Sequence, residues 1–259
     1  MNAAVKAPHT DPANPVKNRY VQSLAVITTA FVVFLGSQIL GVAIISIVGS
    51  FIFGATGDSI TSALENNITV RFLLTLTIEA LTVGLIYRSL KGKRLTFAAI
   101  GLTKRPTSRH LIEALKAYGI YFLVFLSVFT IVGTLGIIDT EQAQQLGFDN
   151  PTGVGLVLTF ISLVILPPIA EEILFRGYLY QRLKVYAPAL AAIVTSVLFA
   201  VAHLEFGTGS PLNWAAALDT FILSLVLIYL VDRTKSLWPA ILLHAIKNAI
   251  AFTSLFLLK

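Results

Sequence analysis

Two adjacent carboxylates, Glu171 and Glu172, lie within the otherwise almost wholly apolar residues 161–174. A charged side chain at the centre of a bilayer costs about 2.5–3.5 kcal/mol on insertion scales, so charges in such places usually serve a function. Two histidines, His203 and His244, occur in later apolar stretches. A carboxylate with a neighbouring imidazole can polarise a water molecule for attack on an amide carbonyl. The sequence therefore predicts hydrolytic chemistry inside a membrane.

The spacing around the two carboxylates gives them different tasks. Glu172 and Arg176 are four residues apart, which places them one helical turn apart and suits them to an ion pair. Alone, such a pair is more typical of a structural clamp than of catalysis. Glu171 points about 100° away from Glu172 around a helix. It is therefore free to act on a water molecule.

A second polar group lies in the last apolar stretch. His244 and Asn248 are also four residues apart and share one helix face, from which both can donate hydrogen bonds to an oxyanion. Glu171 precedes residue 187 by 16 positions and His203 follows it by 16, so a helical hairpin turning there brings both to one height. We predict that all four side chains converge below the membrane surface. An activated water then hydrolyses the peptide bond with no covalent intermediate.

Long apolar runs must position these residues. The chain is 56% hydrophobic and 12% charged, whereas soluble domains are about a quarter charged. Runs of about 20 apolar residues mark membrane spans, and spans without a strand pattern are helices because the backbone must satisfy its own hydrogen bonds. We predict an all-α polytopic membrane bundle of about seven transmembrane helices, within a range of six to eight. The expected spans are residues 21–53, 70–87, 111–138, 154–175, 187–203, 214–231 and 238–258.

The predicted organisation is simple. Residues 1–20 form a polar N-terminal tail, and residues 21–259 form a single membrane domain with the chemistry in residues 154–252. Pro167 and Pro168 interrupt the fourth span, and proline removes a backbone donor and crowds the preceding turn. We therefore expect a kink, with Glu171 in the first turn of the half-helix that follows. The positive end of that helix stabilises a carboxylate by roughly 0.3–2 kcal/mol.

The net charge of +6 follows the expected topology. Lysines and arginines precede the first span and gather in every second link, whereas the intervening links carry acidic residues. This pattern predicts that the basic links and the N-terminus face the cytoplasm, and it argues against a nucleic-acid partner. We find no pattern typical of a removable signal peptide, and expect an integral protein of the plasma (inner) membrane. The absence of cysteine excludes disulfides and thiolate nucleophiles.

Three motifs combine these residues: EExxxRG at 171–177, FxxxH at 199–203 and HxxxN at 244–248. In this order they resemble the type II CAAX prenyl endopeptidase family, also called the CPBP or Abi family of intramembrane proteases. The resemblance implies an enzyme that cleaves membrane-associated protein or lipidated peptide substrates, including CAAX-type prenylated ones, in a cytoplasm-facing cavity. It also implies roles: Glu171 and His203 activate water, His244 and Asn248 form the oxyanion hole, and Glu172 and Arg176 support the site.

Zinc is the cofactor that these residues could hold, through Glu171, His203 and His244. The family has often been classed among metalloendopeptidases. The sequence nevertheless lacks the HExxH spacing, which places two ligands and a base on one helix turn. We favour a glutamic-type, metal-free site that needs no cofactor.

Other functions make different predictions. A non-catalytic bacteriocin-immunity or membrane scaffold protein of the same fold needs no complete set of catalytic residues. A small-solute transporter predicts repeated halves with broken helices, which are not visible in the sequence. A serine-protease interpretation of Ser210 and an aspartyl-protease interpretation of residues 153–155 are weak matches. Glu79 and Asp219, also in apolar spans, are expected to be structural residues that pair helices.

Overall fold

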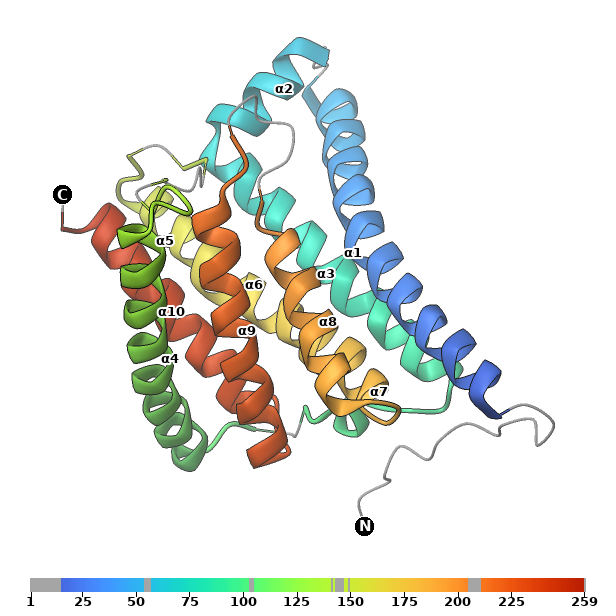
Figure 1. Cartoon of the computed structure of the whole chain (residues 1–259). Coiled ribbons are helices and arrows are strands. Elements are labelled where there is room, and N and C mark those ends of the chain that lie inside the picture. Colours follow the sequence, from blue (N-terminus) through green and yellow to red (C-terminus); the bar gives the residue numbers. More distant parts are fainter. Residues whose placement is uncertain are drawn as a thin grey trace.

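The computed structural model describes residues 15–53, 57–102, 105–140, 142, 147–148, 150–204 and 211–258. Within these residues all regular structure is helical, which confirms the predicted all-α fold (Figure 1). Short 3₁₀ and π segments are labelled η. The elements are α1 (Pro15–Phe53), α2 (Gly57–Asn66), α3 (Ile68–Gly92), η1 (Phe97–Ile100), α4 (Ser108–Thr134), α5 (Val154–Phe160), η2 (Ile161–Ile165), α6 (Leu166–Glu171), η3 (Glu172–Tyr180), α7 (Gln181–Leu183), α8 (Pro188–Val201), α9 (Trp214–Thr234) and α10 (Trp238–Phe256).

Six stretches among the described residues are long and apolar enough to cross a membrane, so the chain is an integral membrane protein. The expected fifth span forms α8, whose 14 residues measure about 21 Å. This is shorter than a hydrocarbon core of about 30 Å. The six long stretches are Arg19–Phe51, Ile68–Gly92, Ser108–Thr134, Val154–Leu183, Trp214–Thr234 and Trp238–Phe256.

The fourth span is one helical stretch built from α5, η2, α6, η3 and α7. Two stretches of π-helix flank α6, and the N–H of Leu166 bonds to the carbonyl of Ile161 five residues earlier. Pro167 and Pro168 lie in the first turn of α6, while Glu171 is its last residue. The expectation that Glu171 lies in a first turn is therefore wrong. Pro167 and Pro168 have no N–H group to donate, and the wider π turn before them accommodates this loss. The helix therefore continues to Glu171 and does not restart there.

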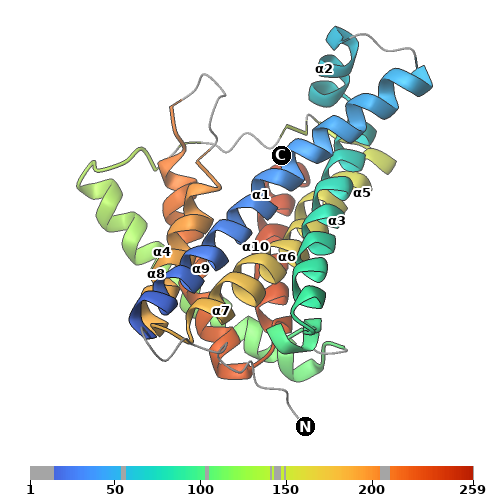
Figure 2. The same ribbon diagram turned by 90° about the vertical axis from the view of Figure 1, so that its right-hand side faces the viewer.

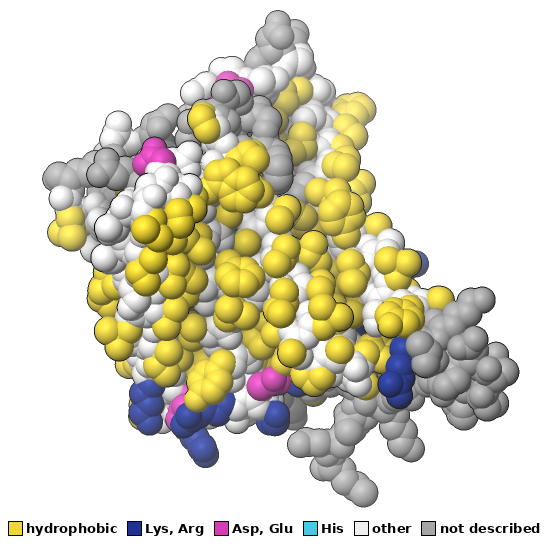
Figure 3. Space-filling view, viewed as in Figure 1, with side chains coloured by type: hydrophobic (Ala, Val, Ile, Leu, Met, Phe, Trp, Pro, Cys, Tyr) yellow, Lys and Arg dark blue, Asp and Glu magenta, His cyan; other side chains and the backbone are white. Residues whose placement is uncertain are grey.

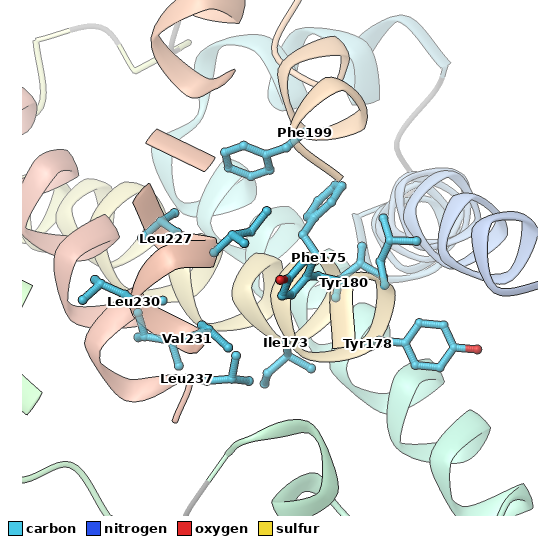
Figure 4. Close-up of a cluster of buried hydrophobic side chains, with 14 of the residues drawn as sticks. Ile173, Phe175, Tyr178, Tyr180, Phe199, Leu227, Leu230, Val231 and Leu237 are labelled. Carbon is cyan, nitrogen blue, oxygen red and sulfur yellow. The ribbon is translucent and has the colours of Figure 1, made fainter. Parts of the chain in front are cut away.

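The later part of this composite span, η3, packs among the other helices. Figure 2 shows α1 and α3 side by side, with α6 and α7 next to them. Gly41 allows the close crossing of α1 and α3, because a Cβ there would lie 2.4 Å from Cγ1 of Ile78. All nine residues of η3 are buried. Figure 4 shows Ile173 and Phe175 on the side of α8, α9 and the start of α10, whereas Tyr178 points to the opposite side, where Ser89 of α3 donates to its hydroxyl.

Basic residues gather at one end of the bundle. The link from α3 to α4, the turn after α7 and the turn after α9 all lie at this end, where α1 also starts (Figure 1). Figure 3 shows lysine and arginine side chains along this edge and a largely apolar flank above them. The first 14 residues of the predicted tail lie outside the described part, and residues 15–20 are helical. The cytoplasmic orientation of the basic end stays a prediction.

Candidate active site

The predicted ion pair lies at the centre of the bundle on η3. The Nη1 of Arg176 is 2.8 Å from Oε1 of Glu172, and both side chains are 0% exposed. The guanidinium also lies over the ring of Phe199, 4.1 Å from its centre. A cation over an aromatic face is stabilised by the ring's negative charge density. The pair expected from the four-residue spacing is thus present and fully enclosed.

Gly177, the last residue of the first motif, allows close helix packing next to this pair, at the basic end of the bundle. A Cβ at Gly177 would lie 2.9 Å from Cδ1 of Ile100 and 3.0 Å from Cδ1 of Leu237. The link containing Ile100 is tied to the start of α10 by a bond of 2.8 Å from the N–H of Leu237 to the carbonyl of Gly101. The absence of a side chain at Gly177 therefore allows η1 and α10 to pack directly on η3.

His244 contacts both carboxylates. Its Nδ1 is 3.1 Å from Oε1 of Glu172, and its Nε2 is 3.9 Å from Oε2 of Glu171. A carboxylate accepts hydrogen bonds, so Nδ1 of His244 carries the proton that Glu172 receives. In a neutral imidazole the lone pair is then on Nε2, directed to the side of Glu171. His244 therefore donates to an oxyanion from Nε2 when it carries a second proton.

His203 lies in a turn immediately after α8. Its Nδ1 is 2.8 Å from the backbone carbonyl of Phe199. Because a carbonyl accepts, Nδ1 donates and the lone pair of neutral His203 is on Nε2. The rings of both His203 and His244 contact Phe199, with centroids 4.7 and 5.9 Å away. Phe199 therefore packs against both histidines and Arg176, a positioning role that the spacing of its motif did not reveal.

The side chain of Asn248 is held by a carbonyl group that the two prolines leave without a backbone donor. Its Nδ2 donates to the carbonyl of Leu163 at 3.0 Å. In a regular helix that carbonyl would accept from residue 167, and in a π turn from residue 168. Both are proline and have no N–H. Asn248 supplies the missing donor and keeps a second amide hydrogen for another acceptor.

Glu171 lies beside this cluster, and fewer contacts hold its side chain than hold the other carboxylate, Glu172. Its side chain is 20% exposed, and it interacts electrostatically with Glu79 of α3. Within the described part of the chain, Oε2 of Glu171, Oε2 of Glu172, and Nε and Nη2 of Arg176 are buried without a hydrogen-bond partner. A buried polar atom without a partner costs about 1–3 kcal/mol. Such a concentration is typical of a catalytic site or of polar groups that water molecules satisfy.

The site residues thus converge to different degrees. Direct contacts join Glu171, Glu172, Arg176 and His244. His203 joins this group through the ring of Phe199, and Asn248 joins it through the backbone of η2. Their catalytic roles stay predictions.

The geometry does not favour a metal. Among the described residues, no three side chains of His, Cys, Asp or Glu gather closely enough to hold an ion. The proposed zinc ligands Glu171, His203 and His244 are included in that part of the chain. Both histidines donate from Nδ1 and keep Nε2 free, as metal-bound histidines do, so it is the spacing of the side chains and not the state of the imidazoles that does not fit an ion. We derive no step through a metal.

One charged group next to the site was not singled out in the sequence. Lys247 lies between His244 and Asn248, and its Nζ is 2.8 Å from Oδ2 of Asp219. The hydroxyl of Tyr121 donates to the other oxygen of Asp219. A lysine inside an otherwise apolar span was the signal that could have identified it. Asp219 does pair helices, as expected, because these contacts connect α4, α9 and α10.

Comparison with known proteins supports the interpretation of the motifs. Residues 153–250 match a family model described as type II CAAX prenyl endopeptidase Rce1-like. The predicted resemblance to this family is confirmed over that segment, which contains all six predicted site residues. No curated protein and no solved structure gives a significant match to the chain.

Proposed function

We propose that this chain is an intramembrane endopeptidase that hydrolyses peptide bonds of membrane-associated substrates with an activated water. The observation that carries the proposal is the contact of His244 with both Glu171 and Glu172 inside the segment that matches the CAAX endopeptidase family. Carboxylates and an imidazole in direct contact, with unpaired buried oxygens, can accept and return protons during hydrolysis.

Glu171 and His203 act on the water. The carboxylate of Glu171 takes one proton as the water oxygen bonds to the carbonyl carbon, and Nε2 of His203 accepts a hydrogen bond that orients the water. When the C–N bond breaks, the proton on Glu171 passes to the leaving nitrogen. The peptide is thereby divided into a carboxylic acid and an amine, and Glu171 returns to its starting state.

Asn248 and His244 stabilise the oxyanion of the tetrahedral intermediate. Asn248 uses the amide hydrogen that Leu163 does not take, so its orientation is already set before substrate binds. Doubly protonated His244 donates from Nε2 while Nδ1 remains bonded to Glu172. Prearranged donors of this kind contribute about 10²–10³-fold to the rate. The ion pair of Glu172 and Arg176 holds His244 in place.

An apolar recess beside the site suits a lipidated substrate. It has a volume of about 290 Å³ and lies between α1, η3 and α8. Phe175, Leu198 and Ala202 contribute to its wall, and Ala202 immediately precedes His203. A prenyl chain in this recess would place the attached peptide near the polar cluster. We further propose that the basic end of the bundle faces the cytoplasm in the plasma (inner) membrane.

Turnover by the purified protein tests the proposal. The wild-type chain in lipid vesicles is mixed with quenched fluorescent peptides, with and without a prenyl group, and compared with Glu171→Gln. We expect Glu171→Gln to lower kcat/KM by about 10²–10⁴-fold, because the proton acceptor is lost. Glu65→Gln is the matched control, since Glu65 is an exposed glutamate on α2.

Equal turnover by wild type and Glu171→Gln would contradict the mechanism. Because the natural substrate need not resemble these peptides, membrane proteomes of cells carrying either form should also be compared. Proteins that are shortened by the wild type but not by Glu171→Gln would identify the substrates. If a phenotype of the deleted gene is fully restored by Glu171→Gln and by His203→Ala, a non-catalytic immunity or scaffold function is favoured instead.

A further inference from the structure

A polar recess and an apolar groove follow one another along the contact between α4 and α9. The recess lies at the basic end and has a volume of about 300 Å³. Its wall consists of Arg109, His110, Glu113, Arg233 and Thr234. The groove lies farther along the same two helices and has a volume of about 360 Å³. Its wall consists of Ile120, Val124, Ile222, Leu225, Val226 and Tyr229.

Tyr229 connects the two cavities. Its side chain lines the groove, and its hydroxyl accepts a hydrogen bond of 2.9 Å from Nη1 of Arg233 in the recess. These two residues are four positions apart on α9, and Glu113 and Ile120 are seven apart on α4. The cavities are therefore separated by about 6–11 Å along the helices. One molecule with a polar head and an apolar chain can occupy both.

The recess carries an excess of positive charge. Glu113 is the acidic residue in its wall, and both of its oxygens face cations. Oε2 is 3.3 Å from Nε of Arg233, and Oε1 is 3.9 Å from Nζ of Lys116. No carboxylate among the described residues pairs with Arg109, which is exposed. The recess therefore attracts an anion.

Hydrogen-bond donors remain in the recess for that anion. A guanidinium has five N–H groups, and Arg233 directs one to Glu113 and one to Tyr229, which leaves the others for a ligand. Nδ1 of His110 accepts from the N–H of Thr107 at 3.1 Å, so neutral His110 carries its proton on Nε2 and can donate it. Guanidinium groups match the geometry of phosphate oxygens and bind them in pairs. A phosphate is thus the anion that suits these donors.

The place of the two cavities in the membrane gives the phosphate a source. Both α4 and α9 are long and apolar enough to span a bilayer, and the recess lies where α4 begins and α9 ends. Figure 3 shows lysine and arginine side chains at this end, next to a largely apolar flank. The recess therefore lies at the level of lipid headgroups, and the groove lies beside the acyl chains. Basic pockets between membrane helices bind anionic headgroups in this way.

Stability alone does not require this cluster of charges. The side chains of Arg233 and Glu113 are 53% and 15% exposed, and ion pairs at a surface contribute about 0–1 kcal/mol. A lipid with a choline headgroup would bring a cation of its own next to Arg109 and Arg233. A lipid with a net negative charge has no such repulsion.

We propose that α4 and α9 bind one anionic glycerophospholipid, with its phosphate in the recess and one acyl chain in the groove. Arg109, His110 and Arg233 bind the phosphate, and Tyr229 positions the guanidinium of Arg233. The bound lipid contacts both helices and stabilises their packing. This inference goes beyond the proposed endopeptidase function and does not depend on it.

Two lipids that differ only in their headgroup test the phosphate site. The purified full chain in detergent is titrated with phosphatidylglycerol or phosphatidylcholine of the same acyl chains, and native mass spectrometry measures the fraction with one lipid bound. We expect the wild type to bind phosphatidylglycerol about 10–100-fold more tightly, the range of hydrogen bonds between charged groups. Its midpoint of thermal unfolding should rise with phosphatidylglycerol and less with phosphatidylcholine. The double variant Arg109→Gln with Arg233→Gln should lower the preference to near one.

Arg88→Gln with Arg94→Gln is the matched control for charge. Both arginines are exposed at the basic end and neither lines the recess, so this variant should keep the preference. An equal loss in the control would mean that the net charge of this end, and not the recess, attracts the lipid, and the inference would be overturned. If the double variant does not fold, Arg109→Gln alone keeps the contact of Arg233 with Glu113 and must still weaken the preference.

The groove is tested by filling it. Val124→Trp places a large ring in its wall, and we expect the affinity for phosphatidylglycerol to fall about tenfold or more because the acyl chain is displaced. Leu123→Trp is the control, since Leu123 is 66% exposed on the same helix and does not line the groove. Glycerol 3-phosphate serves as a probe without acyl chains and should bind far more weakly than the lipid. If it binds as tightly as the lipid and Val124→Trp has no effect, the site takes a free phosphate and the inference is overturned. Equal affinity of the wild type for the two lipids would overturn it as well.

Discussion

The ion pair of Glu172 with Arg176 and that of Asp219 with Lys247 both lie in the described membrane-spanning helices, and they are built differently. Glu172 and Arg176 are four residues apart on η3 and are 0% exposed. Asp219 and Lys247 come from two helices and remain 16% and 22% exposed. Both pairs have N–O distances of 2.8 Å. They differ in enclosure and in their further partners.

The difference separates a pair that holds a neighbouring side chain from a pair that stays partly accessible. Oε1 of Glu172 accepts from both Arg176 and His244, so this enclosed pair holds the imidazole of His244 in one orientation. A ligand has no access to the ionised atoms that make this contact. The pair of Asp219 and Lys247 keeps some accessible surface, and Lys247 lies on the same helix as His244 and Asn248. Ion pairs inside these helices can thus be fully enclosed or partly accessible, and the enclosed pair is the one that contacts His244.

The largest expected loss of stability follows from breaking the buried ion pair of Glu172 and Arg176. In Arg176→Met the carboxylate of Glu172 remains buried without its cation. Breaking a buried pair in this way costs about 3–5 kcal/mol. We expect a large fall in the midpoint of thermal unfolding, measured in detergent. Arg88→Met is the control, because Arg88 is exposed at the basic end and should change stability by about 0.5 kcal/mol or less.

The double variant Glu172→Gln with Arg176→Met sharpens this result. It removes both charges, and an amide oxygen can still accept from Nδ1 of His244. We expect it to be more stable than Arg176→Met alone. If it is no more stable, the loss comes from packing of the guanidinium on Phe199 rather than from an unpaired charge.

A smaller loss of stability is expected when the partly exposed ion pair of Asp219 and Lys247 is broken. In Lys247→Met the carboxylate of Asp219 keeps the hydrogen bond from Tyr121 and some contact with solvent. We expect a cost of about 2 kcal/mol, below the range for a fully buried pair. The same unfolding measurement in detergent tests this order. A loss equal to that of Arg176→Met would show that exposure does not distinguish the two pairs.

The sequence revealed one of these pairs and not the other for a physical reason. Partners four residues apart meet on any helix, so Glu172 and Arg176 could be paired from spacing alone. The contact of Lys247 with Asp219 depends on how α9 and α10 pack, which no local pattern contains. The long helices were predictable in the same sense, because apolar runs of sufficient length leave the backbone few alternatives.

The local geometry around the prolines was also beyond the sequence. Proline predicts a disturbed helix, but not whether the chain kinks or widens into π turns. The observed π turn moved Glu171 from the expected first turn to the end of α6. It also left the carbonyl of Leu163 to Asn248, a contact between segments 85 residues apart. The motif HxxxN identified Asn248 without showing what orients it.

Asn248 provides a neutral contact for comparison with the charged pairs. Asn248→Ala leaves the carbonyl of Leu163 without its side-chain donor, and we expect a stability loss of about 1 kcal/mol. Turnover should fall more steeply, by about 10²–10³-fold, because the proposed oxyanion donor is lost. Thermal unfolding and peptide cleavage measure the two effects. Asn66→Ala is the control, since Asn66 also donates to a carbonyl at 3.0 Å, on exposed α2. A parallel decline in stability and activity would instead indicate a purely structural role.

The smallest expected effect concerns the neutral pair between α1 and α3, outside the segment that matches the family. The hydroxyls of Ser37 and Thr82 lie 2.8 Å apart and are buried. A double-mutant cycle with Ser37→Ala and Thr82→Val should give a coupling of about 0.6 kcal/mol, typical of interhelical hydrogen bonds in membranes. The hydroxyls also bond to carbonyls of their own helices, so losing the partner leaves neither group unsatisfied. A coupling as large as that between Asp219 and Lys247 would mean that charge adds no stability to helix pairing here.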